Sequence, residues 1–195
     1  MVKRELMRPA HPPADKRTKL VETAASLTHR RGFRRTSLAD IAQESGVPLG
    51  NVYYYFKTKD VLGDALVDRL AAGYETLCLR WEQDADPRRR LEAFIQMTVA
   101  NRDGLARSGC PIGSLWAELH KDGGALADHA ATLFAGLLTW IETQFRAMGK
   151  GDASPELAAH LLAATQGASL LTHSFHDSRF ITREAAHLVA WLREL

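Results

Sequence analysis

The sequence has 195 residues, of which 46% are hydrophobic and 25% are charged, and its formal net charge is +2. These fractions are typical of a globular protein with a buried core, and they exclude a disordered or fibrous chain. The sequence has no apolar run of about 18 residues, which excludes a membrane-spanning helix. The two cysteines, Cys78 and Cys110, are too few for a disulfide scaffold or a multi-cysteine zinc site, and they favour a reducing, cytoplasmic location.

The charges are distributed unevenly along the chain. Residues 1–60 carry 12 lysines and arginines against 6 acidic residues, a balance of +6, whereas residues 61–195 have a balance of −4. A basic segment on a mildly acidic remainder suggests an N-terminal unit that binds a polyanion. The alternative is a basic surface that only faces solvent.

The chain begins with a proline-bearing basic segment over residues 1–15, which lacks the apolar stretch of a signal peptide and is predicted to be a flexible arm. The pattern then becomes helical. Leu20, Ala24 and Leu27 have the spacing of one helix face. Gly32 stands where a glycine would end that helix.

Three further helices are predicted before residue 82. Ser37 can cap a short helix, with an acidic residue three positions later, and Gly46 interrupts it. Pro48 suits the first turn of the next helix. Thr58 can cap a long fourth helix, which carries Val61 on its expected apolar face.

The rest of the chain continues as helices separated by loop signals. The breaks are expected at Asp86-Pro87, Gly109-Cys110-Pro111, Gly123-Gly124 and 149–154, and Thr182 is expected to cap the last helix. No alternation of β-branched residues and no hairpin turn signal is present. The sequence therefore predicts an all-α protein of about nine helices, with a three-helix domain over 16–60 and a second helical domain over 61–195.

The segment that carries the functional signal is TSLADIAQESGVPLGNVYYYFKTK, residues 36–59. Two short helices around a glycine-containing turn predict a helix-turn-helix, whose second helix can enter the DNA major groove. Gly50 allows the backbone to approach DNA, and Asn51 can pair with an adenine edge. Lys57 and Lys59 lie at a helix N-terminus, where a cation opposes the macrodipole, so phosphate is a natural partner. Three consecutive tyrosines point in different directions on a helix, so at least one is expected to pack.

The first 60 residues resemble the DNA-binding domain of the TetR family of transcriptional regulators. The resemblance rests on four pieces in order: Ala24-Ala25-x-Leu27 with Gly32-Phe33, then Thr36-Ser37-Leu38-x-x-Ile41-Ala42, then Gly46-Val47-x-x-Gly50-x-Val52-Tyr53-x-Tyr55-Phe56, then Lys59 with Leu62. It implies phosphate contacts from Thr36, Ser37, Tyr53, Tyr55 and Lys59, and base contacts from Leu49, Gly50, Asn51 and Tyr54. The family often has serine where this chain has Pro48, so one polar group is missing here.

The resemblance also implies a C-terminal domain that binds a small-molecule effector and forms a homodimer through the last two helices. The stretch 154–175 agrees, because it is apolar nearly all round and must be covered on most sides. Burial within one chain is the alternative. Candidate effector-binding residues combine apolar bulk with polar tips: Phe94, Met97, Cys110, Trp116, His120, Trp140, Gln166 and His173. For each one, core packing is the competing interpretation.

The resulting hypothesis is a repressor that binds a palindromic operator as a homodimer and is released by an effector. The alternative input is oxidation or alkylation of Cys110, whose place before a helix and near Arg102 and Arg107 could lower its pKa. A buried, inert thiol is the competing interpretation. A metal at His173 and His176 is not expected, because carboxylates do not accompany them. No cofactor is predicted, and no enzyme motif such as a Walker loop or a nucleophile elbow occurs, which leaves an unrelated enzyme as a distant alternative.

Overall fold

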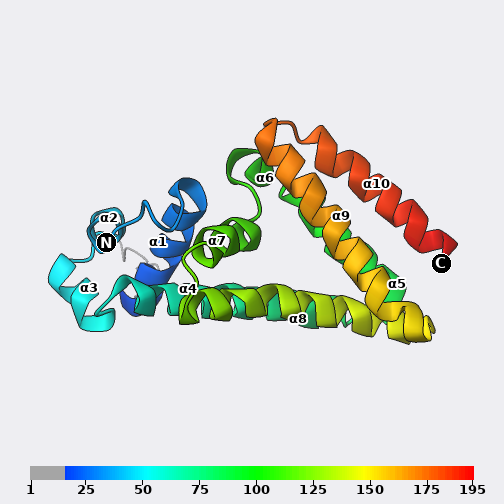
Figure 1. Ribbon diagram of the computed structural model, residues 1–195, viewed down its shortest axis with the longest axis horizontal. Coiled ribbons are helices and arrows are strands. Elements are labelled where there is room, and N and C mark those ends of the chain that lie inside the picture. The colour runs from blue at the N-terminus through cyan, green and yellow to red at the C-terminus, as the bar shows by residue number, and fades with distance from the viewer. Residues whose placement is uncertain (1–15) are drawn as a thin grey trace, which may run out of the picture.

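The computed structural model describes residues 16–195, and the predicted arm over 1–15 lies outside the described residues. This part of the chain is all-α, as predicted (Figure 1). Its elements are α1 (Lys16–Arg31), α2 (Leu38–Ser45), α3 (Leu49–Tyr55), α4 (Lys59–Trp81), α5 (Pro87–Ala100), α6 (Arg102–Ser108), α7 (Pro111–His120), α8 (Ala125–Ala147), the 3-10 turn η1 (Gly151–Ala153), α9 (Ser154–Ser174) and α10 (Arg179–Glu194).

The N-terminal unit, which we call the head, consists of α1, α2, α3 and the first turns of α4. Leu20 and Leu27 of α1, Ile41 of α2 and Val52 of α3 are almost completely buried in one cluster. Leu62 of α4 joins the same cluster, so the long helix enters the core of the head directly. Burial of these apolar side chains holds the short α2 and α3, which are too short to be stable alone.

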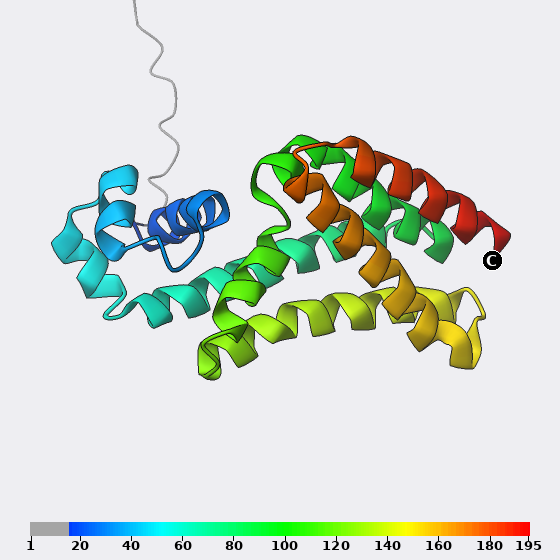
Figure 2. The same cartoon turned by 45° about the horizontal axis from the view of Figure 1, so that its top comes forward.

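The remaining helices form a C-terminal bundle around a second core. α4 and α8 run side by side along the long axis of the molecule, and α5, α9 and α10 pack at the end away from the head (Figure 1). Leu91, Phe94, Ile95, Ile141 and Phe145 are fully buried there. α9 and α10 lie next to each other on the outside of the bundle in both views (Figure 1, Figure 2).

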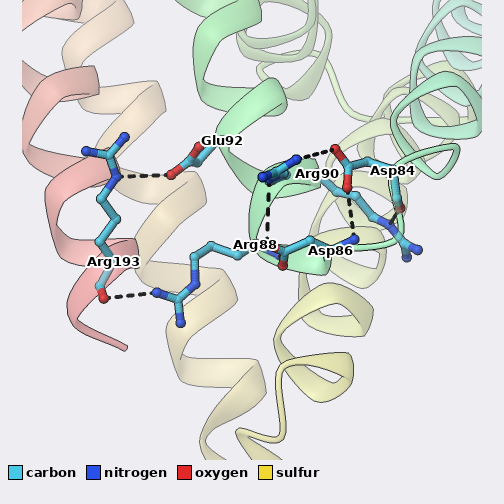
Figure 3. Close-up of polar contacts among 7 residues, drawn as sticks. Asp84, Asp86, Arg88, Arg90, Glu92 and Arg193 are labelled. Carbon is cyan, nitrogen blue, oxygen red and sulfur yellow. Dashed lines mark hydrogen bonds and ion pairs between the residues drawn. The ribbon is translucent and has the colours of Figure 1, made fainter.

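Polar contacts fix α5 against the end of α10 (Figure 3). Arg88 Nη1 donates to the carbonyl oxygen of Arg193 at 2.9 Å, and Arg193 Nε lies 3.4 Å from Glu92 Oε1. At the start of α5, Arg90 Nε donates to the carbonyl oxygen of Asp84 at 2.8 Å. A cationic group at a helix C-terminus is favourable for the helix dipole, so these contacts stabilise the last turn of α10.

Three local predictions were wrong. The helix expected from Pro87 to the Gly109 break ends at Ala100, because Asn101 leaves helical geometry with φ −97° and ψ 13°, and α6 follows as a separate helix. Residues 16–195 hold ten α-helices, in line with the expected number of about nine. The last helix begins at Arg179, three residues before the expected cap at Thr182. Val61 is 46% exposed, because it lies about 100° around α4 from the buried Leu62 and so on another side of the helix. Within residues 16–195, no helix combines the length and the apolarity that crossing a bilayer requires.

Candidate nucleic-acid interface and cavities

The helix-turn-helix is fixed by backbone and capping contacts. Ser37 Oγ accepts the N–H of Asp40 at 3.1 Å, and the N–H of Ser37 donates to Asp40 Oδ2 at 2.8 Å, which is a complete capping box. These hydrogen bonds hold the pKa of Asp40 below its usual value. Gly46 ends α2 at φ 66°, a conformation in which a side chain is strained, and its N–H donates to the carbonyl of Gln43. The capping box of α2 and the turn at Gly46 therefore fix the orientation of α3 relative to α2.

α3 is anchored on one side and open on the other. Val52 is completely buried, whereas Leu49 is 40%, Tyr53 48% and Tyr54 74% exposed. Gly50 faces open space, since a Cβ built there would meet no atom within 4 Å. Exposed apolar and aromatic side chains on a rigid helix next to a bare glycine form a surface that can enter a groove.

The other predicted α3 residues are divided between the surface and the core. Asn51 is half-buried, and its contact with a base stays a prediction. Tyr55 packs against the core of the head, and its ring meets that of Tyr54 edge-on at 5.1 Å. At least one of the three tyrosines therefore packs, as expected, while Tyr53 and Tyr54 face outward.

Three predicted phosphate contacts already have partners within the protein, and one of them is Ser37, whose hydroxyl donates to Asp40 Oδ2. Thr36 is buried, and its hydroxyl donates to the carbonyl of Gly32 at 2.8 Å. Lys59 Nζ donates to the carbonyl of Arg34 at 3.0 Å and lies 4.6 Å from the centre of the Phe33 ring, and its burial lowers the pKa of its ammonium group. Thr36 and Lys59 hold the loop between α1 and α2.

Lys57 is exposed in the turn before α4, and Ser37 is exposed at the start of α2. Their contacts with phosphate, like those of Thr36 and Lys59, stay predictions. Lys57 differs from Lys59 because its side chain faces solvent, so it is the more available of the two lysines to an external partner.

Two adjacent cavities lie in the C-terminal bundle, and the larger one is open to the surface, because Ala71, Glu75, Thr132 and Gly136 in its lining are exposed. The larger, of about 240 Å³, opens between α4 and α8 and is lined by Ala71, Tyr74, Glu75, Cys78, Ile112, Thr132, Leu133, Gly136, Leu137 and Trp140. The smaller, of about 70 Å³, is lined by Tyr74, Phe94, Met97, Thr98, Asn101, Leu105, Cys110, Pro111, Leu137, Thr165, Gln166 and Ser169. Tyr74 and Leu137 line both cavities, so the two cavities adjoin at these side chains.

The cavities bring together five of the eight predicted effector-binding residues. Phe94, Met97, Cys110 and Gln166 meet at the smaller cavity, and Trp140 lines the larger one. The other three lie elsewhere. Trp116 and His120 stack on each other with ring centres 4.7 Å apart, and His173 has Nδ1 3.3 Å from the carbonyl oxygen of Ala106; none of the three lines either cavity.

Cys110 is the N-cap residue of α7, and its Sγ accepts the N–H of Gly113 at 3.5 Å. Burial nevertheless raises the pKa of its thiol, because desolvation outweighs the hydrogen bonds from Gly113, Ile112 and Gln166. The raised pKa agrees with the interpretation of a buried thiol and not with the thiol-sensing alternative; Arg102 contacts Asp103 and the carbonyl of Val99. Burial also raises the pKa of Cys78 to about 11.

The head and the bundle are joined by contacts that the sequence did not indicate. His29 Nε2 lies 2.9 Å from the carbonyl oxygen of Gly109, directly before the cavity residue Cys110. The N–H of Arg34 donates to Glu118 Oε2 at 3.0 Å, and its guanidinium pairs with Asp122. Hydrogen bonds and an ion pair therefore connect the head to both ends of α7.

Sequence reasoning also missed Tyr74, although a signal was present. Tyr74 lies four residues after Leu70, which packs against the core of the bundle, so the same face of α4 carries an aromatic residue with a polar tip. For His29 no comparable signal exists, since its partner is 80 residues away along the chain.

Comparisons with known proteins agree with this architecture. A family model described as bacterial regulatory proteins, tetR family, matches residues 20–66. The chain is 30% identical over 144 residues to the transcriptional regulator AcuR of Cereibacter sphaeroides, a match that covers 69% of this chain and 63% of AcuR. It is 31% identical over 91 residues to the HTH-type transcriptional repressor NemR of Escherichia coli, covering 46% of each. The chain thus spans about half the length of the curated relatives it matches.

The likeness in structure extends over nearly the whole chain. A TetR transcriptional regulator from Legionella pneumophila has the same fold, with a TM-score of 0.84, 16% identity, and coverage of 93% of this chain and 98% of that one. These similar proteins are transcriptional regulators and not enzymes, which agrees with the prediction from the motifs. The helix-turn-helix, the helical bundle and these matches together show that the chain belongs to the TetR family of bacterial regulatory proteins.

Proposed function

We propose that this protein is a transcriptional repressor that binds a palindromic operator as a homodimer and is released by a small-molecule effector. The observation that carries the proposal is α3, which is anchored by Val52 and presents Leu49, Gly50 and Tyr54 to the outside. The basic balance of residues 1–60 supports a polyanionic partner. Similarity to NemR, itself a repressor, supports repression over activation.

An exposed apolar surface on α9 and α10 supports the homodimer. Leu170 is 65%, Leu171 43%, Phe175 64% and Phe180 36% exposed, and the two phenylalanine rings stack at 5.4 Å between centres. Contiguous apolar surface of this kind usually marks a protein interface. A two-fold axis through this pair of helices brings the same surface of each copy together, and two heads related in this way match a palindromic operator.

The effector part of the proposal rests on the two cavities and on the helix they share with the head. Tyr74 and Cys78 of α4 line the cavities, and Leu62 of the same helix lies in the core of the head. A ligand that binds more tightly when α4 is in one of two positions shifts the equilibrium toward that position of the helix and of the head. The change in the free-energy difference between the two positions equals the difference in the ligand's binding free energy.

The experiment that tests this function is selection of bound DNA from a random pool with the full chain. The expected result is a palindromic sequence whose half-sites lie about one helical turn apart, or a multiple of it. In a titration at fixed salt, Asn51→Ala is expected to cost about 1–3 kcal/mol at one base position in each half-site. Gln43→Ala, on the exposed surface of α2, is the matched control. Recovery of no enriched sequence, or equal loss of affinity for all sequences with Asn51→Ala, would contradict the assignment of α3 as the reading helix.

A further inference from the structure

The hydroxyl groups around the smaller cavity donate hydrogen bonds to backbone carbonyls. Thr165 Oγ1 donates to the carbonyls of Leu161 and Leu162 at 3.1 and 2.9 Å, and Ser169 Oγ donates to the carbonyl of Thr165 at 2.7 Å. Thr98 Oγ1 donates to the carbonyl of Ile95 at 2.7 Å. Each hydroxyl has one hydrogen and two lone pairs, so these three oxygens can offer only lone pairs to a ligand.

The larger cavity has the same character. Thr132 Oγ1 donates to the carbonyl of His129 at 2.7 Å, and Trp140 Nε1 donates to Glu82 Oε1 at 2.8 Å. Glu75, the one carboxylate in its lining, is an acceptor when ionised. Among the described residues, neither cavity is lined by lysine, arginine or histidine.

Few donors remain. The amide of Gln166 donates to the Cys110 thiol, which is one of the contacts that oppose the rise in the pKa of that thiol. Tyr74, which lines both cavities, has a hydroxyl that can either donate or accept. The exposed Asn101 adds another amide at the rim of the smaller cavity, and the thiols of Cys78 and Cys110 are weak donors. The site is thus rich in acceptors and poor in donors.

A ligand that brings an acceptor or an anion to this site leaves its own polar group unpaired, and burying an unpaired polar group or charge is costly. A ligand that brings a hydroxyl or N–H finds lone pairs on several sides. The volume sets the size of the apolar part: a cavity of roughly 150 Å³ takes up benzene. The larger cavity, at about 240 Å³, has room for two fused rings.

We propose that the two cavities form one effector site for a flat two-ring molecule that carries a single hydroxyl or N–H donor and no anionic group. The rings occupy the larger cavity beside Trp140, and the donor points past Tyr74 and Leu137 to the lone pairs of Thr165 and Ser169. This proposal rests on the proposed function, since it names the chemical class of the effector for the same domain.

Three probes of equal ring size test the donor requirement: 2-naphthol, 2-methoxynaphthalene and 2-naphthoate. Binding to the full chain without DNA is measured by calorimetry and by quenching of tryptophan fluorescence, because Trp140 lines the larger cavity and Trp81 lies 5.3 Å from it between ring centres. The naphthol is expected to bind at least about fivefold more tightly than the ether, the ratio that one net hydrogen bond supplies, and the naphthoate more weakly still.

Two variants locate the ligand. Gly136→Leu fills the larger cavity without a backbone clash, because a Cβ at Gly136 meets nothing within 4 Å, and it is expected to abolish binding of the naphthol and the ether. Gly73→Leu is the matched control, since Gly73 is also an exposed helical glycine with open space around it but lines neither cavity. Thr165→Val keeps the shape of the side chain and removes one acceptor. It is therefore expected to weaken binding of the naphthol and to leave binding of the ether unchanged.

Each outcome decides the proposal. It is overturned if the ether or the naphthoate binds as tightly as the naphthol, if none of the probes binds, or if Gly136→Leu binds the naphthol as the Gly73→Leu control does. DNA binding of the same variants is measured separately. Retained DNA binding with failed probe discrimination overturns this inference alone, whereas naphthol that binds without releasing DNA contradicts the effector part of the proposed function.

Discussion

The hydrogen bond between His29 and Gly109 is expected to contribute measurably to the free energy of unfolding. His29 is the last-turn residue of α1 whose Nε2 lies 2.9 Å from the carbonyl oxygen of Gly109, and Gly109 is buried. His29→Leu keeps apolar bulk but removes the donor. The buried carbonyl then loses its partner, which costs about 1–3 kcal/mol.

Urea unfolding at fixed protomer concentration measures this cost, because association shifts apparent stability. With a slope of about 1–3 kcal/mol per molar urea, the midpoint should fall by roughly 1 M. All four tryptophans, at positions 81, 116, 140 and 191, belong to the C-terminal bundle, so fluorescence reports the bundle while circular dichroism reports both units. Without the hydrogen bond between His29 and Gly109, the unfolding curves from fluorescence and from circular dichroism are expected to differ, because the head unfolds at a lower urea concentration than the bundle.

His187→Leu is the matched control, since His187 lies on α10 with its side chain 80% exposed, 3.9 Å from Glu184. Its effect should stay within about 0.5 kcal/mol, as for most surface substitutions. Equal midpoints for His29→Leu and His187→Leu would refute the reasoning, because the contact between head and bundle would then contribute no more than an exposed side chain.

Four shorter predictions concern the interface, the cap, the dimer and the thiols. Lys57→Ala should weaken binding to all DNA sequences alike and reduce the slope of log K against log salt by about 1. Ser37→Ala should lower the free energy of unfolding by about 1 kcal/mol in thermal or urea unfolding. The pKa of Asp40 is lowered in the folded state, so the stability that its ionised carboxylate contributes is present above its unfolded pKa and is lost as pH falls through the lower folded value. The stabilities of the variant and the wild type should therefore converge in acid. Leu170→Glu should convert a dimer to monomers in sedimentation, and an unchanged mass would remove the proposed interface. Both cysteines should alkylate slowly at neutral pH in the native protein, since burial raises both pKa values, and rapid modification of Cys110 would restore the thiol-sensing alternative.

The helix-turn-helix could be predicted because its signals are local. Ser37 and Asp40 form their capping box within one turn, and Gly46 needs its left-handed conformation only to end α2. These contacts span three residues or fewer, so sequence spacing determines them. The end of α5 was missed although a signal was present: the polar stretch Asn101-Arg102-Asp103-Gly104 interrupts the apolar pattern, and its Asp-Gly pair is typical of a turn.

The cavities could be predicted only in part, because the relative rotation of helices decides which side chains meet. Phe94 and Gln166 were expected from their residue types and do share a cavity, although they come from α5 and α9. Trp116 has the same apolar bulk, but α7 turns it toward His120 and Phe134. Residue type predicts that a side chain can line a cavity, and packing between distant helices determines whether it does.

α4 supplies the geometry by which a small change at the cavities can reach the DNA. Fifteen residues separate Lys59 from Tyr74, so a rigid helix places them about 22 Å apart. A tilt of about 5° near Tyr74 then displaces the first turn of α4 by about 2 Å over that length. A hydrogen bond to a base tolerates only a few tenths of an ångström, since donor–acceptor distances range over about 2.7–3.2 Å. In the proposed dimer the two heads shift in opposite directions, so the mismatch with fixed half-sites is doubled. A tilt of this size near Tyr74 is therefore enough to break the hydrogen bonds between α3 and the bases. The hydrogen bonds of His29 with Gly109 and of Arg34 with Glu118 determine how far the head moves with α4.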